Sequence, residues 1–322
     1  MKYLAVILMA VILLVYFFMP SQKAQVGEPL TEDQLLRIDI KPVGPEVPIV
    51  PIPPVVEPIW KKWPRVREIQ NPSLGVILGD IESHMPANHH YRDSNKMTWA
   101  HETTHGINAN IRNSIQQNRE RFNGFYVLQD RAVVLREPNI TIQDVAKLVP
   151  NVLRGPSYKL YLVEQAYSWG DRPLYLVDEW VSYTNGSETG KELNLFGWYF
   201  ELLQAHNFNV YCIYMAMCVQ RDVSNYNDTE LRKFLMWNIE RVFRISMPSD
   251  RDKVVLPDGS IAMKALNQFI CPHHTLQVGS QTDLKDVDDY VDKVRTAPEA
   301  EKLRIFAREY FGEEWCKRIY GF

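Results

Sequence analysis

The chain has 322 residues, a formal net charge of −3 and 46% hydrophobic residues. This length and hydrophobic fraction suit one good-sized folded domain with appendages. The weakly acidic balance, without any basic block, argues against a nucleic-acid-binding protein. Composition alone identifies no substrate.

The N-terminus indicates export. Lys2 is followed by an unbroken apolar run from Leu4 to Met19. Its length lies between that of a secretory signal, about 7–15 residues, and that of a membrane span, about 20 residues. Cleavage after Ala24 would place Gln22 where a small residue is required. Residues 1–24 are therefore expected to be a signal peptide or an uncleaved membrane anchor, with the anchor slightly favoured.

Residues 25–64 are expected to form a stalk. Prolines recur at every third position from Pro42 to Pro54, which is the period of a polyproline II helix. A stiff spacer is favoured over a ligand for a proline-recognising module, and its apolar residues could also pack along the domain. The folded domain is then expected to span residues 65–322.

Two β elements are expected early in this domain. Residues 75–81 are predicted to be a strand, which could align an extended substrate through main-chain hydrogen bonds or be purely structural. Residues 125–128 and 132–135 are predicted to pair as a hairpin that turns at residues 129–131.

Residues 97–112 are predicted to form a helix with an N-cap at Asp93-Ser94, and they contain the pattern HExxH. Residues four apart share one helix face, so His101 and His105 can bind one ion. Glu102 lies beside that face, where it can act as a base. The pattern supplies two zinc ligands and a general base, while the alternative is an amphipathic helix with two surface histidines.

The rest of the chain is predicted to be helical, which gives an α+β fold dominated by helix with a small antiparallel sheet. Thr141 and Asp144 form a capping box for a short helix ending at Leu148. Asn185-Gly186 is expected to end a helix. Further helices are predicted at residues 158–169, 173–183, 193–206, 210–220, 228–245, 260–269, 283–294 and 298–311.

The HExxH helix resembles that of the zincin metallopeptidases. The metzincin branch would need Gly and His at positions held by Asn108 and Ile111. The gluzincin branch takes its third ligand from a Glu on a later helix, often with Ser three residues on, and Glu179 and Ser182 stand in that relation. The resemblance covers only these two stretches. It implies a zincin-like fold, a zinc ion held by His101, His105 and Glu179, and a peptide or protein substrate.

Two features of the predicted site stay open. Glu179 is preferred as third ligand because it lies on a polar helix face, ahead of Glu164, with Asp171 a distant third. Tyr183 stands where thermolysin-like enzymes carry an Asp that orients a ligand histidine, and Asp178 is the candidate to replace that Asp.

Three residues, Tyr183, Tyr167 and His206, could each donate a hydrogen bond to an oxyanion, although a packing role is favoured for each. His84, His89 and His90 are expected in a solvated loop. Cys212 and Cys218 are each expected to pair with Cys271 or Cys316, or all four cysteines are small buried hydrophobic residues.

The sequence therefore predicts an exported, membrane-tethered zinc endopeptidase in which Glu102 is the general base. One alternative is a catalytically weak or inactive zincin-fold protein that binds or scaffolds in the cell envelope. Another is an envelope interaction protein that uses the proline-rich segment and has a metal-free domain.

Overall fold

The computed structural model describes residues 57–115, 121–247, 253–255, 261–263 and 284–322. The chain divides into a segment Met1–Pro53 and a compact unit Pro54–Phe322. The predicted signal or anchor at residues 1–24 and the stalk up to residue 56 lie outside the described residues. Among the described ranges, no helix has the length and apolar character that crossing a membrane requires.

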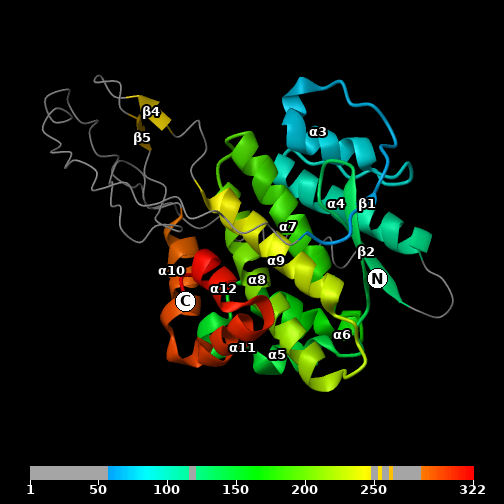
Figure 1. The fold of residues 1–322 in the computed structure, drawn as a ribbon. Coiled ribbons are helices and arrows are strands. Elements are labelled where there is room, and N and C mark those ends of the chain that lie inside the picture. The colour runs from blue at the N-terminus through cyan, green and yellow to red at the C-terminus, as the bar shows by residue number, and fades with distance from the viewer. Residues whose placement is uncertain (1–56, 116–120, 248–252, 256–260, 264–283) are drawn as a thin grey trace, which may run out of the picture. The chain divides into compact units, whose positions relative to one another are not determined.

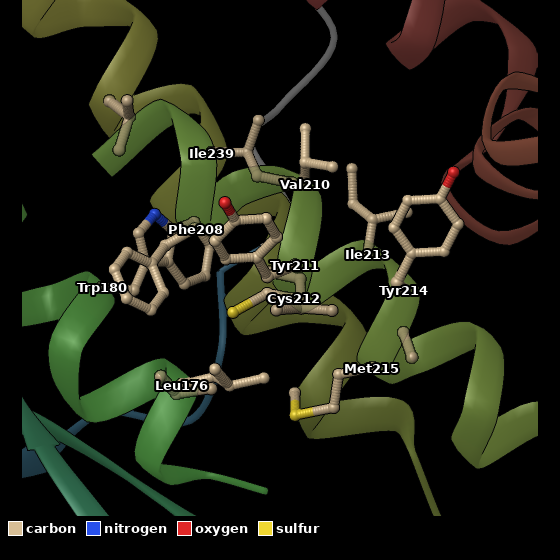
Figure 2. Packing of buried hydrophobic residues seen from close by; sticks show 14 of the residues in the cluster. Leu176, Trp180, Phe208, Val210, Tyr211, Cys212, Ile213, Tyr214, Met215 and Ile239 are labelled. Atoms are coloured by element: carbon tan, nitrogen blue, oxygen red, sulfur yellow. The ribbon is translucent and has the colours of Figure 1, made fainter. Parts of the chain in front are cut away.

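Three long helices build the larger hydrophobic core. Helix α7 (Tyr175–Glu192) packs along α8 (Trp198–Asp222), and α9 (Thr229–Ser246) contacts both (Figure 1). Figure 2 shows Trp180 of α7 with Phe208 and Tyr211 of α8 in this core, and all three side chains are fully buried. Each such burial stabilises the fold by roughly 2–3 kcal/mol, so the α7–α8 contact fixes where α7 presents its polar face.

A second core joins two helices to the sheet. Helices α3 (Gly75–His84) and α4 (Lys96–Ile115) pack against the hairpin of β2 (Phe122–Tyr126) and β3 (Arg131–Arg136). The strands are antiparallel, with Phe125 opposite Val133. The predicted hairpin is thus confirmed, as is the α+β class dominated by helix with a small antiparallel sheet.

The folded unit begins before residue 65, inside the predicted stalk. Strand β1 (Lys61–Lys62) pairs with β3, which gives the strand order β1-β3-β2. The Trp60 ring meets Trp237 of α9 edge-on, with the ring centroids 4.7 Å apart. The end of the proline-rich segment therefore packs against the domain.

The prediction of a strand at residues 75–81 is wrong, because these residues form α3. The buried side chains of Leu74, Leu78 and Ile81 follow helical spacing and face the second core. At the start of α3, the Glu192 carboxylate accepts hydrogen bonds from the backbone N–H groups of Val76 and Ile77. The proposed substrate-aligning strand is therefore absent from this segment.

Two predicted helix boundaries are also wrong. Asn185-Gly186 does not end a helix, since α7 continues to Glu192. The predicted helices at 193–206 and 210–220 form one helix, α8, which begins at Trp198. Buried asparagines within both helices donate hydrogen bonds locally or to other elements: Asn207 donates to Leu203 O at 2.9 Å, and Asn185 donates to Thr104 Oγ1 at 3.0 Å. Tertiary packing thus overrides low helix propensity.

The other elements agree more closely with the sequence. The capping box of Thr141 and Asp144 is confirmed at the start of α5. Residues 261–263 form a strand where a helix was predicted over 260–269, and residues 264–269 lie outside the described ranges. The remaining elements are η1 (Pro72–Leu74), α5 (Ile142–Leu148), η2 (Asn151–Leu153), a π-helix η3 (Lys159–Glu164), α6 (Ala166–Trp169), β4 (Lys253–Val255), β5 (Ile261–Met263), α10 (Lys285–Thr296), η5 (Pro298–Ala300), α11 (Glu301–Phe311) and α12 (Glu313–Ile319).

Cys212, Cys218 and Cys316 are buried thiols that form no disulfide with one another. A Cys212–Cys316 or Cys218–Cys316 bond is therefore excluded, and Cys271 lies outside the described residues. Burial raises the pKa of the Cys212 thiol well above its ordinary value. It behaves as a small hydrophobic side chain.

Candidate metal centre

Helix α4 carries the HExxH pattern and packs against α7. Its N-cap is Asn95 rather than Asp93-Ser94, because Asn95 Oδ1 accepts from the Met97 backbone N–H at 3.0 Å. Ala100, Thr104 and Ile107 are buried on the helix. This anchoring directs His101 and His105 towards α7.

Three donor atoms converge between α4 and α7. The Nε2 atoms of His101 and His105 lie 3.0 Å apart, and Glu179 Oε2 lies 3.5 Å from each of them. Glu179 Oε2 is buried and has no hydrogen-bond partner among the described residues. These residues could therefore hold a metal ion.

Two of the three distances between the donors match a tetrahedral ion. Zinc binds His nitrogen and carboxylate oxygen at about 2.0–2.2 Å, so two ligands of one tetrahedral ion lie about 3.3–3.5 Å apart. The observed distances between donor atoms are 3.0, 3.5 and 3.5 Å. A bound ion would also give the buried Glu179 Oε2 the partner that it otherwise lacks. The residues present thus fit a zinc ion.

The rival carboxylates lie elsewhere. Glu164, on the π-helix η3, is exposed and pairs with Lys159 at 3.4 Å. Asp171 is exposed and pairs with Arg121 at 2.6 Å. Of the three acidic residues weighed as third ligand, the structure brings only Glu179 to the two histidines.

Carboxylates surround both histidines and set the electrostatics of the site. Burial lowers the pKa of His101, but the Glu179 and Glu201 carboxylates more than offset it and raise this pKa to about 9. The pKa of His105 is raised well above its ordinary value, because Asp178 and Glu179 outweigh burial. Burial raises the pKa of Glu179, but the two histidines bring it down to about 2. The site favours positive charge where the donors meet.

Asp178 holds the outer nitrogen of His105. Its Oδ1 lies 3.1 Å from His105 Nδ1 and also accepts a hydrogen bond from Asn108 Nδ2 at 2.7 Å. A proton on Nδ1 leaves the Nε2 lone pair directed towards Glu179. Such an outer partner fixes the tautomer of a metal-binding histidine.

The candidate oxyanion donors differ in position. The Tyr183 ring meets His101 edge-on with the ring centroids 4.4 Å apart, and its hydroxyl lies 2.6 Å from that of Tyr161. Tyr167 is 90% exposed. His206 is packed in the core, where its Nε2 lies 3.1 Å from Ser246 Oγ and its ring meets Phe243. The structure places Tyr183 beside the site and does not place His206 there.

Comparison with known proteins finds no family model, curated protein or solved structure that matches the chain. The likeness to gluzincins therefore rests on the residues of α4 and α7 themselves.

Two further residues near the site were not identified from the sequence as site residues. Glu201, in the first turn of α8, has its Oε2 3.6 Å from His101 Nδ1. No local motif marks it, because its role depends on how α8 packs. A Cβ on Gly106 would lie 2.6 Å from His89 Nδ1, so the His89 ring rests against α4.

His84 corrects the expectation of a solvated histidine loop, because it ends α3 and is fully buried. It forms a second group of possible metal ligands with Asp80 and Asp130. Both carboxylates already have protein partners: Tyr126 and the Gln129 backbone N–H donate to Asp80, and Arg65 donates to Asp130. This group is satisfied without an ion, unlike the centre at Glu179.

Proposed function

We propose that this protein is an exported zinc-dependent endopeptidase of the zincin type, with a gluzincin-like ligand set of His101, His105 and Glu179. The observation that carries the proposal is the buried Glu179 Oε2, which lies 3.5 Å from both histidine Nε2 atoms and has no hydrogen-bond partner among the described residues. An unsatisfied buried carboxylate oxygen facing two imidazole nitrogens is the arrangement that a cation completes.

The donor types narrow the choice of metal. Two imidazoles and one carboxylate suit zinc, and they also occur in octahedral non-haem iron sites. In an octahedron, neighbouring ligands meet at right angles and lie about 3.0 Å apart at similar bond lengths. The two 3.5 Å distances match the wider tetrahedral angle and the 3.0 Å between the histidine nitrogens matches a right angle, so the preference for zinc rests on the HExxH pattern. Bound zinc supplies Lewis acidity towards the substrate carbonyl and lowers the pKa of water.

Glu102 is the general base in this proposal. It follows His101 directly on α4, and its side chain is half-buried. Its carboxylate accepts a proton from the attacking water as the water oxygen bonds to the scissile carbonyl carbon. It then donates that proton to the nitrogen of the leaving amine as the peptide bond breaks, which restores the carboxylate.

Tyr183 is the candidate donor to the carbonyl oxygen. Its hydroxyl and that of Tyr161 are 2.6 Å apart, and one hydrogen bond between them uses only one of their two protons. With Tyr161 as the donor of that bond, the Tyr183 proton is left for an oxyanion formed beside His101. The pair of tyrosines would also hold the Tyr183 ring in place.

Metal analysis and peptide hydrolysis test this function on the full-length chain. We expect about one zinc per chain and cleavage of a mixture of unstructured peptides. Glu179→Ala should lose the zinc and the activity, while the matched control Glu164→Ala, at an exposed carboxylate, should keep both. Zinc binding without cleavage would support the binding or scaffold alternative. Equal zinc loss in both variants, or stoichiometric iron, would overturn the proposed site.

A further inference from the structure

Glu201 is a partly buried carboxylate that reaches the candidate metal centre from a third helix. It lies in the first turn of α8, and its side chain is 21% exposed. Its Oε2 is shielded from solvent and has no hydrogen-bond partner among the described residues. Its ion-pair contact is with His101 Nδ1 at 3.6 Å, on the side of the ring opposite the donor that faces Glu179.

Gly186 makes room for this carboxylate. It lies inside α7, where glycine is less favourable than alanine. A Cβ on Gly186 would lie 2.9 Å from Glu201 Oε2 and 3.3 Å from the Met97 backbone oxygen. The first contact is too short for real Cβ atoms, and the second is tight. The space above Gly186 therefore holds the end of the Glu201 side chain.

Gly190 lies one turn further along the same face of α7. A Cβ there would lie 2.5 Å from both Met97 Sδ and Trp198 Cβ. The two glycines thus let α7 approach the starts of α4 and α8 closely. This approach places a residue of α8 next to a histidine of α4.

We propose that Glu201 is a positioning residue for His101, and that Gly186 exists to admit it. The negative charge of the Glu201 carboxylate, 3.6 Å from His101 Nδ1, favours a proton on that nitrogen and so leaves the Nε2 lone pair for the metal, as Asp178 does for His105. Each ligand histidine would then be oriented by its own carboxylate, one from α7 and one from α8. This inference rests on the proposed metal centre, but Glu201 itself contacts neither metal nor substrate.

Zinc affinity, measured on the full-length chain by competition with a chelator, tests the proposal. Glu201→Gln keeps the shape of the side chain and removes its charge, so it should weaken zinc binding about 10–100-fold. Gly186→Ala should weaken it similarly by displacing the carboxylate. Because both changes break the same contact, their effects should not add. The double variant should bind zinc as tightly as the more strongly affected single variant. The matched control is Gly79→Ala in α3, where a new Cβ meets nothing within 4 Å.

The absorption spectrum of the cobalt-substituted protein gives a second readout, which a purely structural role would not move. It should change in Glu201→Gln and stay unchanged in Gly79→Ala, because it reports the geometry of the ligands. Unchanged affinity and spectrum in Glu201→Gln would overturn the positioning role even if Gly186→Ala fails to fold. If the unaltered chain binds no zinc, the proposed function is wrong. If zinc binding depends on Glu179 but does not change in Glu201→Gln, only the positioning role of Glu201 is wrong.

Discussion

Asp178 Oδ1 lies 3.1 Å from His105 Nδ1 and accepts a hydrogen bond from Asn108 at 2.7 Å. Asp178 precedes the candidate ligand Glu179 in sequence, so one turn of α7 supplies both a ligand and the partner of another ligand. The resemblance to gluzincins did not assign this partner, because Tyr183 stands at the usual position, and Asp178 was the candidate from the sequence. Asp178 provides the carboxylate from a different position on the same helix.

Asp178→Asn should weaken zinc binding about 10–100-fold, the usual effect of losing an outer partner of a ligand histidine. The amide can still accept one hydrogen bond, but it lacks the negative charge that stabilises positive charge on His105. Chelator competition measures the change. Asp171→Asn, at an exposed carboxylate paired with Arg121, should leave the affinity unchanged. If the unaltered chain, Asp178→Asn and Asp171→Asn bound zinc equally well, Asp178 would have no role in the site.

Glu102→Gln should keep zinc and fold but reduce peptide cleavage at least about a hundredfold, since a general base contributes about that much. The amide cannot take a proton from the attacking water. Zinc content and circular dichroism verify that the variant is otherwise intact, and kcat measures the loss. Cleavage at the normal rate would assign the base to another residue.

The sequence predicted those features whose cause is local. The hairpin needs only two apolar runs with a turn between them, and the α5 capping box needs only Thr141 and Asp144. The HExxH spacing places His101 and His105 on one helix face, and the structure has them there. In each case, residues within a few positions of one another determine the geometry.

Features that depend on distant segments were predicted poorly. Residues 75–81 have few polar side chains, which suggests a strand, but the start of α3 is capped by Glu192, over a hundred residues away. Gly186 looks like a helix terminator until α8 is placed, since its role is to leave space for Glu201. Glu201 has no local signal at all. The packing of α4, α7 and α8 creates these relationships.

Glu192→Ala should destabilise the protein by about 1–2 kcal/mol, as the loss of a helix N-cap does. The change removes a carboxylate that accepts from the Val76 and Ile77 backbone N–H groups at 2.7 and 2.8 Å. Urea unfolding measures the free energy of unfolding. The control is Glu309→Ala on the exposed face of α11, which should change it by less than about 0.5 kcal/mol. A null effect for Glu192→Ala would show that α3 is held by its buried face alone.

His206 is buried in the core beside Ser246, and we expect it to make the protein sensitive to acid. Burial, with a smaller contribution from Arg295, lowers the pKa of His206 from 6.5 to about 3. The folded and unfolded states both hold it neutral above pH 6.5. Below pH 6.5, the His206 imidazole binds a proton in the unfolded state but not in the folded state. The free energy of unfolding therefore falls by up to about 1.4 kcal/mol per pH unit, down to about pH 3.

His206→Gln should remove this slope, because an amide does not titrate and can still bond to Ser246 Oγ. Urea unfolding between pH 6.5 and 3.5 measures the difference in slope between the two proteins, while zinc content and kcat at neutral pH should stay the same. The control is His90→Gln at an exposed histidine, which should keep the original slope. If His206→Gln instead lost activity and kept the slope, His206 would act on the substrate, and its packing against Phe243 would not be its main role.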